Sequence, residues 1–140
     1  MKKILVILSL VLFCFALPAS AEVYLAKDAI KIEREKMGGG VGTVSCEYAF
    51  TRDKAAAEHA TKEIAVLTIP PGASIGYHKH DVNEDSYTII SGTGVFKDAD
   101  GKEYNVGPGD MTVIRAGQSH GIVNNGDVPL VIVSVIAGQE

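Results

Sequence analysis

Three histidines and an acidic pair are the residues of this chain whose types and spacing best suit metal binding. His78 and His80 are separated by a single residue, Glu84 and Asp85 follow within five residues, and His120 lies further along the chain. Side chains at positions i and i+2 of a β-strand point to the same face, so the first two histidines can share one cation. Imidazole and carboxylate are ligands for Fe, Mn, Ni, Zn or Co, and four such ligands leave positions open for substrate.

The segments around these residues have the character of β-strands rather than helices. Short apolar or alternating runs, separated by turn residues, occupy residues 30–32, 44–50, 64–69 and 128–136. Residues 98–101 and 124–127 predict hairpin turns, because Asp-Gly and Asn-Gly supply the positive φ that tight turns need. Residues 51–62 predict a polar loop or a short helical turn. About ten short strands without a long helix predict an all-β barrel or a double-sheet jelly roll.

The histidine pair lies in a pattern that resembles the first sequence motif of the cupin superfamily. That motif reads Gly, five residues, His-x-His, three or four residues, Glu, six residues, Gly, and it matches residues 72–92. Counting back from Gly92 puts the acidic ligand at Asp85. The shorter allowed spacing from His80 puts it at Glu84 instead.

A second pattern, over residues 109–124, resembles the other cupin motif. It reads Gly, five residues, Pro-x-Gly, two residues, His, three residues, Asn. The two glycines, His120 and Asn124 are in register, whereas Arg115 stands where the family has proline. The resemblance implies a cupin-type double-stranded β-helix, a jelly-roll barrel, that carries its ligands at one mouth.

The same resemblance implies a cofactor, one divalent transition metal (Fe, Mn, Ni, Zn or Co). Its ligands would be His78, His80 and His120 together with Asp85 or Glu84. Small cupins commonly pair, and apolar strands in excess of what one small barrel hides also favour a homodimer.

Strand parity helps to choose the acid and predicts the residues near the substrate. Asp85, Tyr87 and Ile89 share one face of an alternating strand, which favours Asp85 over Glu84 as the inward carboxylate. Tyr87 and Ile89 are then expected to line the pocket. Arg115 is interpreted either as a solvated strand-end arginine or as a bidentate clamp for a substrate carboxylate.

The N-terminal residues read as a targeting segment rather than as part of the fold. Two lysines, an apolar run over residues 4–17 and the small residues 19–21 predict a signal peptide over residues 1–21. Residues 22–140 then form a single domain in the periplasm or outside the cell. No second apolar run follows, so no membrane association is expected after cleavage. Cys46 remains as the one mature cysteine and is predicted to be a buried, inert thiol.

Charge narrows the partners, and the site leaves two classes of function open. The chain has 13 basic and 17 acidic residues. Cleavage removes two lysines and no acidic residue, so the mature chain is more acidic still, which argues against nucleic acid as a partner. The expected partner is a small molecule. The first hypothesis is a metal-dependent enzyme of dioxygenase, isomerase, decarboxylase or lyase type, acting on an organic ligand that carries a carboxylate if Arg115 is a clamp. The alternative is a non-catalytic module that binds a small molecule, a sugar or a metal.

Overall fold

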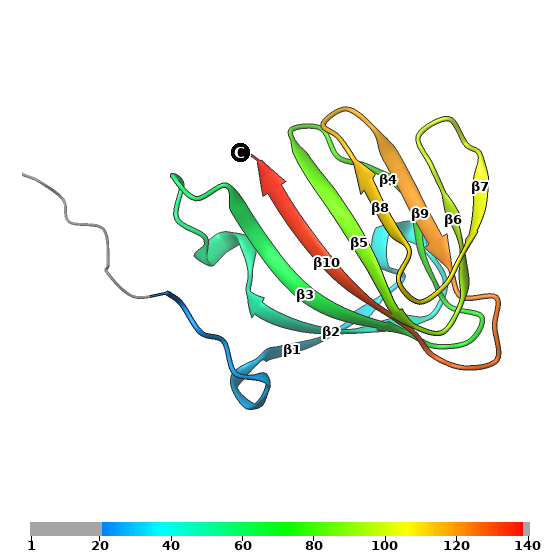
Figure 1. The fold of residues 1–140 in the computed structure, drawn as a ribbon, viewed down its shortest axis with the longest axis horizontal. Helices are drawn as coiled ribbons and strands as arrows, with labels where there is room; N and C mark the ends of the chain where they lie inside the picture. The colour runs from blue at the N-terminus through cyan, green and yellow to red at the C-terminus, as the bar shows by residue number, and fades with distance from the viewer. Residues whose placement is uncertain (1–20, 139–140) are drawn as a thin grey trace, which may run out of the picture.

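The computed structural model describes residues 21–138 and folds them into two antiparallel β-sheets (Figure 1). The six-stranded sheet contains, in spatial order, β1 (Ile30–Glu35), β2 (Thr43–Phe50), β3 (Thr61–Ile69), β10 (Leu130–Gly138), β5 (Asn83–Ser91) and β8 (Met111–Ile114). The four-stranded sheet contains β4 (Ser74–Lys79), β9 (Ser119–Val123), β6 (Gly94–Lys97) and β7 (Glu103–Val106).

The helical content of residues 21–138 is limited to three short 3-10 turns. These are η1 (Ala26–Asp28), η2 (Met37–Gly39) and η3 (Arg52–Lys54). The all-β jelly-roll prediction is therefore confirmed, and η3 lies in the stretch expected to form a loop or a helical turn. No helix in the described part of the chain is long and apolar enough to cross a membrane. The predicted signal peptide lies, except for Ala21, outside the described residues.

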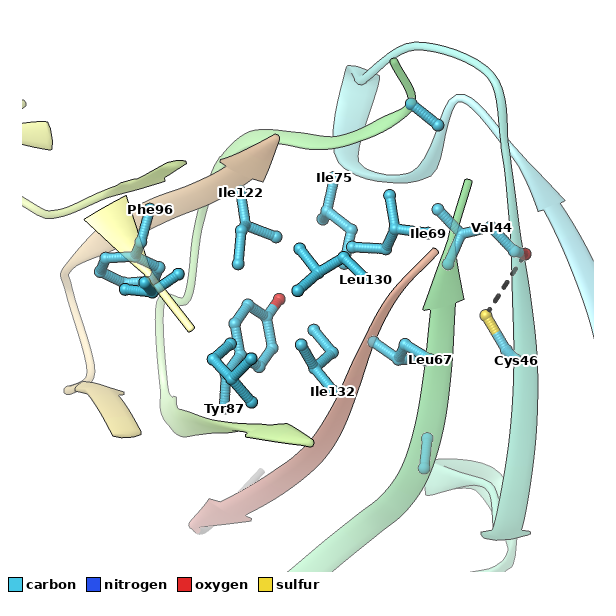
Figure 2. Packing of buried hydrophobic residues seen from close by; sticks show 14 of the residues in the cluster. Val44, Cys46, Leu67, Ile69, Ile75, Tyr87, Phe96, Ile122, Leu130 and Ile132 are labelled. Atoms are coloured by element: carbon cyan, nitrogen blue, oxygen red, sulfur yellow. Dashed lines mark hydrogen bonds between the residues drawn. The ribbon is translucent and has the colours of Figure 1, made fainter. Parts of the chain in front are cut away.

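The core lies between the two sheets (Figure 2). Ile75 and Ile122 of the four-stranded sheet meet Ile69, Leu130 and Ile132 of the six-stranded sheet, and all five side chains are almost completely buried. Alternation along each strand decides which residues enter the core, because successive side chains of a strand point to opposite faces. Burial of these aliphatic side chains fixes the register of the strands that carry the site.

The inward residues change character along the strands. Leu130 pairs with Ile69 and Ile132 with Leu67, so this end of the interior is apolar on both strands. Two and four residues further along β10, Ser134 and Ile136 pair with Ala65 and Glu63. The polar side chains of Ser134 and Glu63 are both buried. The interior thus has an apolar end and a polar end.

Cys46 lies at the apolar end, as predicted for a buried thiol. It is the one free cysteine among the described residues, and its Sγ donates a hydrogen bond to the Val44 carbonyl at 3.6 Å. Burial raises the pKa of this thiol, which keeps it protonated and unreactive.

Candidate metal centre

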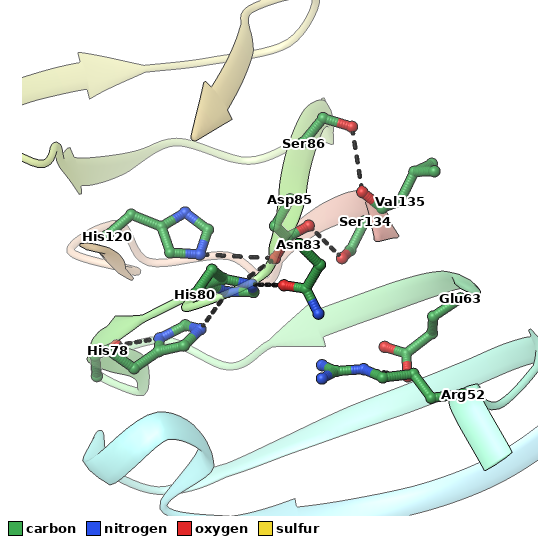
Figure 3. Close-up of polar contacts among 11 residues, drawn as sticks. Arg52, Glu63, His78, His80, Asn83, Asp85, Ser86, His120, Ser134 and Val135 are labelled. Atoms are coloured by element: carbon green, nitrogen blue, oxygen red, sulfur yellow. Dashed lines mark hydrogen bonds and ion pairs between the residues drawn. The ribbon is translucent and has the colours of Figure 1, made fainter. Parts of the chain in front are cut away.

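The three histidines converge at the polar end of the interior (Figure 3). His78 on β4 and His120 on β9 are direct partners across the sheet, and His80 follows the end of β4. The ring centroids lie 4.9 Å (His78 to His80), 4.8 Å (His78 to His120) and 5.1 Å (His80 to His120) apart. One ligand nitrogen from each ring lies within 4.8 Å of the others, so the three side chains can hold one metal ion.

A β-bulge in β4 directs His78 into the cluster. Ile75 pairs with Ile122 and His78 with His120, so three steps along β4 correspond to two steps along β9. In a regular strand, residues three apart would face opposite sides, and the extra residue at the bulge restores the inward direction of His78.

The backbone of a neighbouring turn packs directly against this bulge. A Cβ atom on Gly76 would lie 2.3 Å from the carbonyl oxygen of Gly38 and 2.5 Å from the nitrogen of Gly40. A Cβ on Gly40 would lie 2.2 Å from the Ser74 oxygen. Only glycine permits this approach, so η2 and the residue after it support the strand that carries His78.

The hydrogen bonds of His78 and His80 fix their tautomers. His78 Nδ1 lies 2.8 Å from the Gly76 carbonyl oxygen, and His80 Nδ1 lies 2.8 Å from Asn83 Oδ1. Both partners are acceptors, so each neutral ring carries its hydrogen on Nδ1 and presents a lone pair at Nε2.

The two Nε2 atoms of this pair lie 3.0 Å apart. Two lone pairs that face each other repel unless a cation lies between them. Nitrogens bound to one metal at about 2.1 Å and at right angles are themselves about 3 Å apart. The separation therefore fits the geometry of two ligands on one ion.

His120 is fully buried, and neither of its ring nitrogens hydrogen-bonds to any described residue. Its ring stacks on Tyr87, with centroids 4.8 Å apart and an interplanar angle of 25°. Burial lowers the pKa of His120 to about 3, with the other two histidines adding to the effect. The ring is neutral at pH 7, which is the ligating form, and a metal at Nε2 would satisfy a buried polar atom that otherwise costs stability.

Asp85, rather than Glu84, lies beside the histidines. Its Oδ2 is 3.5 Å from His120 Nε2 and 3.8 Å from His80 Nε2, and its Oδ1 accepts a 3.0 Å hydrogen bond from Ser134. Burial raises the pKa of Asp85 to about 7 against the opposing effect of the Ser134 hydrogen bond. Glu84 points to the outer face.

The predicted substrate residues are placed differently from one another. Tyr87 lines the cavity beside the histidines, whereas Ile89 packs in the apolar core. Arg115 is exposed on the outside of the barrel, where its guanidinium pairs with Glu84. The structure does not bring Arg115 into the cavity.

A cavity of about 650 Å³ opens beside the centre. The predicted residues His78, His80, Asp85 and Tyr87 line part of it, and residues that the sequence did not suggest line the rest. Among these are Arg34 of β1, Tyr48 of β2, Arg52 of η3 and Glu63 of β3. Arg52 Nε lies 3.7 Å from Glu63 Oε2. These residues come from three strands and one 3-10 turn, so their proximity depends on how the elements pack in the tertiary structure rather than on spacing along the chain.

Comparison with known families matches this site and fold. The family model described as Cupin domain matches residues 65–136, which include the three histidines and Asp85. The chain belongs to the cupin family.

Relatives of this cupin include proteins linked by name to oxalate. An oxalate-binding protein from Thermotoga maritima is 38% identical over 100 residues, which span 71% of this chain and 80% of the relative. The crystal structure of a predicted oxalate decarboxylase from Thermotoga maritima matches with a TM-score of 0.75 and 31% identity, covering 84% of this chain and 99% of that one. KdgF from a Halomonas species shares the fold, with a TM-score of 0.64, 16% identity and coverage of 86% and 97%.

The donor set of this cupin suits a divalent transition metal. Neutral imidazoles and a single carboxylate would leave such an ion with net positive charge and with positions open to the cavity. An ion in that setting supplies a Lewis acid that attracts an anionic ligand. The side chains that surround it decide which ligand fits.

Proposed function

We propose that this cupin holds one divalent transition metal at His78, His80, Asp85 and His120 and binds a small organic carboxylate there. The observation that carries the proposal is the pair of Nε2 lone pairs 3.0 Å apart, beside a fully buried histidine without a hydrogen bond to any described residue. Oxalate is the first candidate ligand, and the names of the two Thermotoga maritima relatives support this choice.

The residues around the centre have separable roles in this proposal. Gly76 and Asn83 accept hydrogen bonds from the Nδ1 atoms of His78 and His80, which directs both Nε2 atoms toward the ion. Ser134 donates to Asp85 and orients its carboxylate. Tyr87 stacks on His120 and closes the wall of the site, which limits the access of water.

Calorimetry and elemental analysis test the proposal. Protein purified without chelator or metal-affinity resin is expected to carry about one metal per chain, and oxalate is expected to bind to it but not to the metal-free protein. The double variant His78→Ala/His80→Ala removes two ligands and should abolish both metal and oxalate binding. Lys79→Ala is the matched control, because Lys79 lies between the histidines on the outer face and pairs with Asp81.

Catalysis is the second candidate, and the buried carboxyl of Glu63 favours it. Glu63 is 8% exposed and lines the same cavity as the metal site, where it can deliver or accept a proton. A decarboxylase would break the carbon–carbon bond of oxalate and take up one proton to give formate and carbon dioxide. Formate release by the metal-loaded protein would support this candidate, and stable oxalate without turnover would leave the binding role.

Export through cleavage after residue 21 is also part of the proposal. The basic, apolar and small-residue segments at the N-terminus support it. The mass of the chain recovered from the periplasm or medium tests it, because cleavage predicts a protein that begins at Glu22. A full-length chain retained in the cytoplasm would contradict it.

A further inference from the structure

The metal centre opens into a cavity that is much larger than oxalate. The volume of this cavity is about 650 Å³. Pockets that hold small organic ligands typically measure about 300–1,000 Å³. Oxalate fills roughly 100 Å³, the space of three or four water molecules, so it would leave most of the cavity to solvent. The cavity therefore has room for a larger carboxylic acid.

Two isoleucines of β1 form an apolar wall of this cavity. β1 is an edge strand of the six-stranded sheet (Figure 1), and its Ile30 pairs with Tyr48 of β2. Ile32 pairs with Cys46. Directly paired side chains point to the same face of a sheet, and those of Tyr48 and Cys46 are completely buried. Ile30 and Ile32 therefore face inward too, yet they are 40% and 37% exposed, and both line the cavity.

Two further apolar side chains connect this wall to the metal centre. Met37 of η2 lines the cavity and packs against the core. The next residue, Gly38, lies so close to His78 that a Cβ atom on it would be 2.9 Å from His78 Nδ1. Ile136 also lines the cavity, and it pairs with the candidate ligand Asp85 across β10 and β5. The apolar surface thus adjoins both the histidines and the carboxylate.

The charged side chains of the cavity balance one another. Three cations and three acids line it, namely Arg34, Arg52 and Lys54, and Asp53, Glu63 and Asp85. Arg52 forms an ion pair with Glu63, and Lys54 forms one with Asp53. A second charged group on a ligand would lose its hydration without gaining an excess of opposite charge in this cavity. An apolar group, in contrast, meets an apolar wall.

We propose that the metal centre binds monocarboxylic acids that carry an apolar chain or ring, with the carboxylate on the metal and the apolar group against Ile30, Ile32 and Met37. The inference rests on the proposed function and deepens it, because it names the class of organic acid. Burial of each methylene group strengthens binding about fourfold. The unbranched thioether of Met37 lets this wall adapt to apolar groups of different shape.

Titration of the metal-loaded protein with acetate and with hexanoate tests the inference. The two acids share one carboxylate and differ only in the length of the alkyl chain. Hexanoate is expected to bind about tenfold to a hundredfold more tightly, because part of its chain is buried. Neither acid should bind to the metal-free protein at the same concentrations. Hexanoate that binds no more tightly than acetate, or that binds equally well without the metal, overturns the inference without the use of any variant.

The double variant Ile30→Thr/Ile32→Thr tests where the alkyl chain lies. Threonine keeps the β-branched shape that suits a strand but replaces apolar surface with a hydroxyl group. Hexanoate affinity is expected to fall about tenfold, whereas acetate affinity should stay within about twofold. Metal content per chain should not change. Ile90→Thr is the matched control, because Ile90 is 51% exposed on β5 and does not line this cavity.

The outcomes separate the inference from the proposed function. Parent-like hexanoate binding by the double variant, or an equal loss in Ile90→Thr, overturns the inference. The proposed function stands in that case, provided that oxalate or acetate still binds to the metal-loaded parent. A metal-loaded parent that binds none of the three acids overturns the proposed function, and the inference with it. Thermal unfolding of each variant confirms that the fold is intact.

Discussion

Along β10, Leu130 and Ile132 fill one end of the barrel interior, while Ser134 donates a hydrogen bond to Asp85 beside the histidines at the other. The neighbouring β5 makes the same change, from Ile89 in the core to Asp85 beside the histidines. The same strands and the same alternation thus build a packed region and a polar cavity only a few residues apart. This barrel therefore separates the packed core from the polar cavity along its strands rather than between its sheets.

The two ends differ in what burial contributes. At the apolar end, removal of aliphatic surface from water stabilises the fold. At the polar end, burial works against the charged form of Asp85 and leaves His120 without a hydrogen bond to any described residue, and a bound metal would offset both costs. Substitutions at the two ends should therefore have different effects on stability and on metal binding.

The largest effect on stability is expected at the apolar end. Leu130→Ala removes a side chain with no exposed surface and should lower the free energy of unfolding of the metal-free protein by about 2–5 kcal/mol. Chemical denaturation measures this change. Metal affinity of the folded fraction should stay close to that of the parent. If Leu130→Ala lowers the free energy of metal binding by more than it lowers the free energy of unfolding, the two ends are not independent.

The substitution Asp85→Asn at the polar end is expected to raise the stability of the metal-free protein, whereas Leu130→Ala lowers it. The pKa of Asp85 is raised by burial from 3.8 to about 7, so its protonated form is favoured in the folded state. The stability of the metal-free protein should therefore fall as the pH rises from about 4 through about 7, and then level off. Asp85→Asn cannot ionise, so its advantage over the parent should grow across this range by about 3 kcal/mol.

Denaturation of metal-free parent and variant at pH 5 and pH 8 measures that advantage. In competition with a chelator, the same variant should lose metal affinity, since the amide carries no charge. Equal pH dependence of parent and variant would show that Asp85 is ionised without cost in the folded state.

The smallest effect is expected outside the barrel. Glu84→Gln removes the partner of Arg115 in an exposed pair, which should change the free energy of unfolding by less than about 0.5 kcal/mol. Metal content should match that of the parent. If Glu84→Gln loses more metal than Asp85→Asn, the shorter motif spacing is the one in use.

Short-range sequence patterns predicted the strands and the shared side of His78 and His80, whereas His120 was predicted from the resemblance to the second cupin motif. Alternation and turn residues predicted the strands. The i, i+2 spacing of His78 and His80 predicted that both side chains point to the same face of a strand. The same alternation predicted that Asp85, and not Glu84, points inward. These rules act within one or two strands, so they can be applied without knowledge of the tertiary structure.

The second wall of the cavity could not be predicted in this way. Arg52 of η3 and Glu63 of β3 line the same cavity as His78 and His80, and this depends on how distant elements pack against one another. Arg115 follows Ile114, which is 2% exposed at the end of β8, so the next side chain along the chain points outward. Motif position suggested a role for Arg115, whereas the orientation of the strand end decided its place.

The contact between η2 and the bulge in β4 has a consequence for protein engineering. The region that defines the family, residues 65–136, contains all four candidate ligands, but Gly38 and Gly40 lie before it. A chimaera built from that region alone would keep the ligands and lose the brace that sets the direction of His78. A graft that transfers this centre to another barrel must therefore begin upstream, with the hairpin of β1 and β2 included.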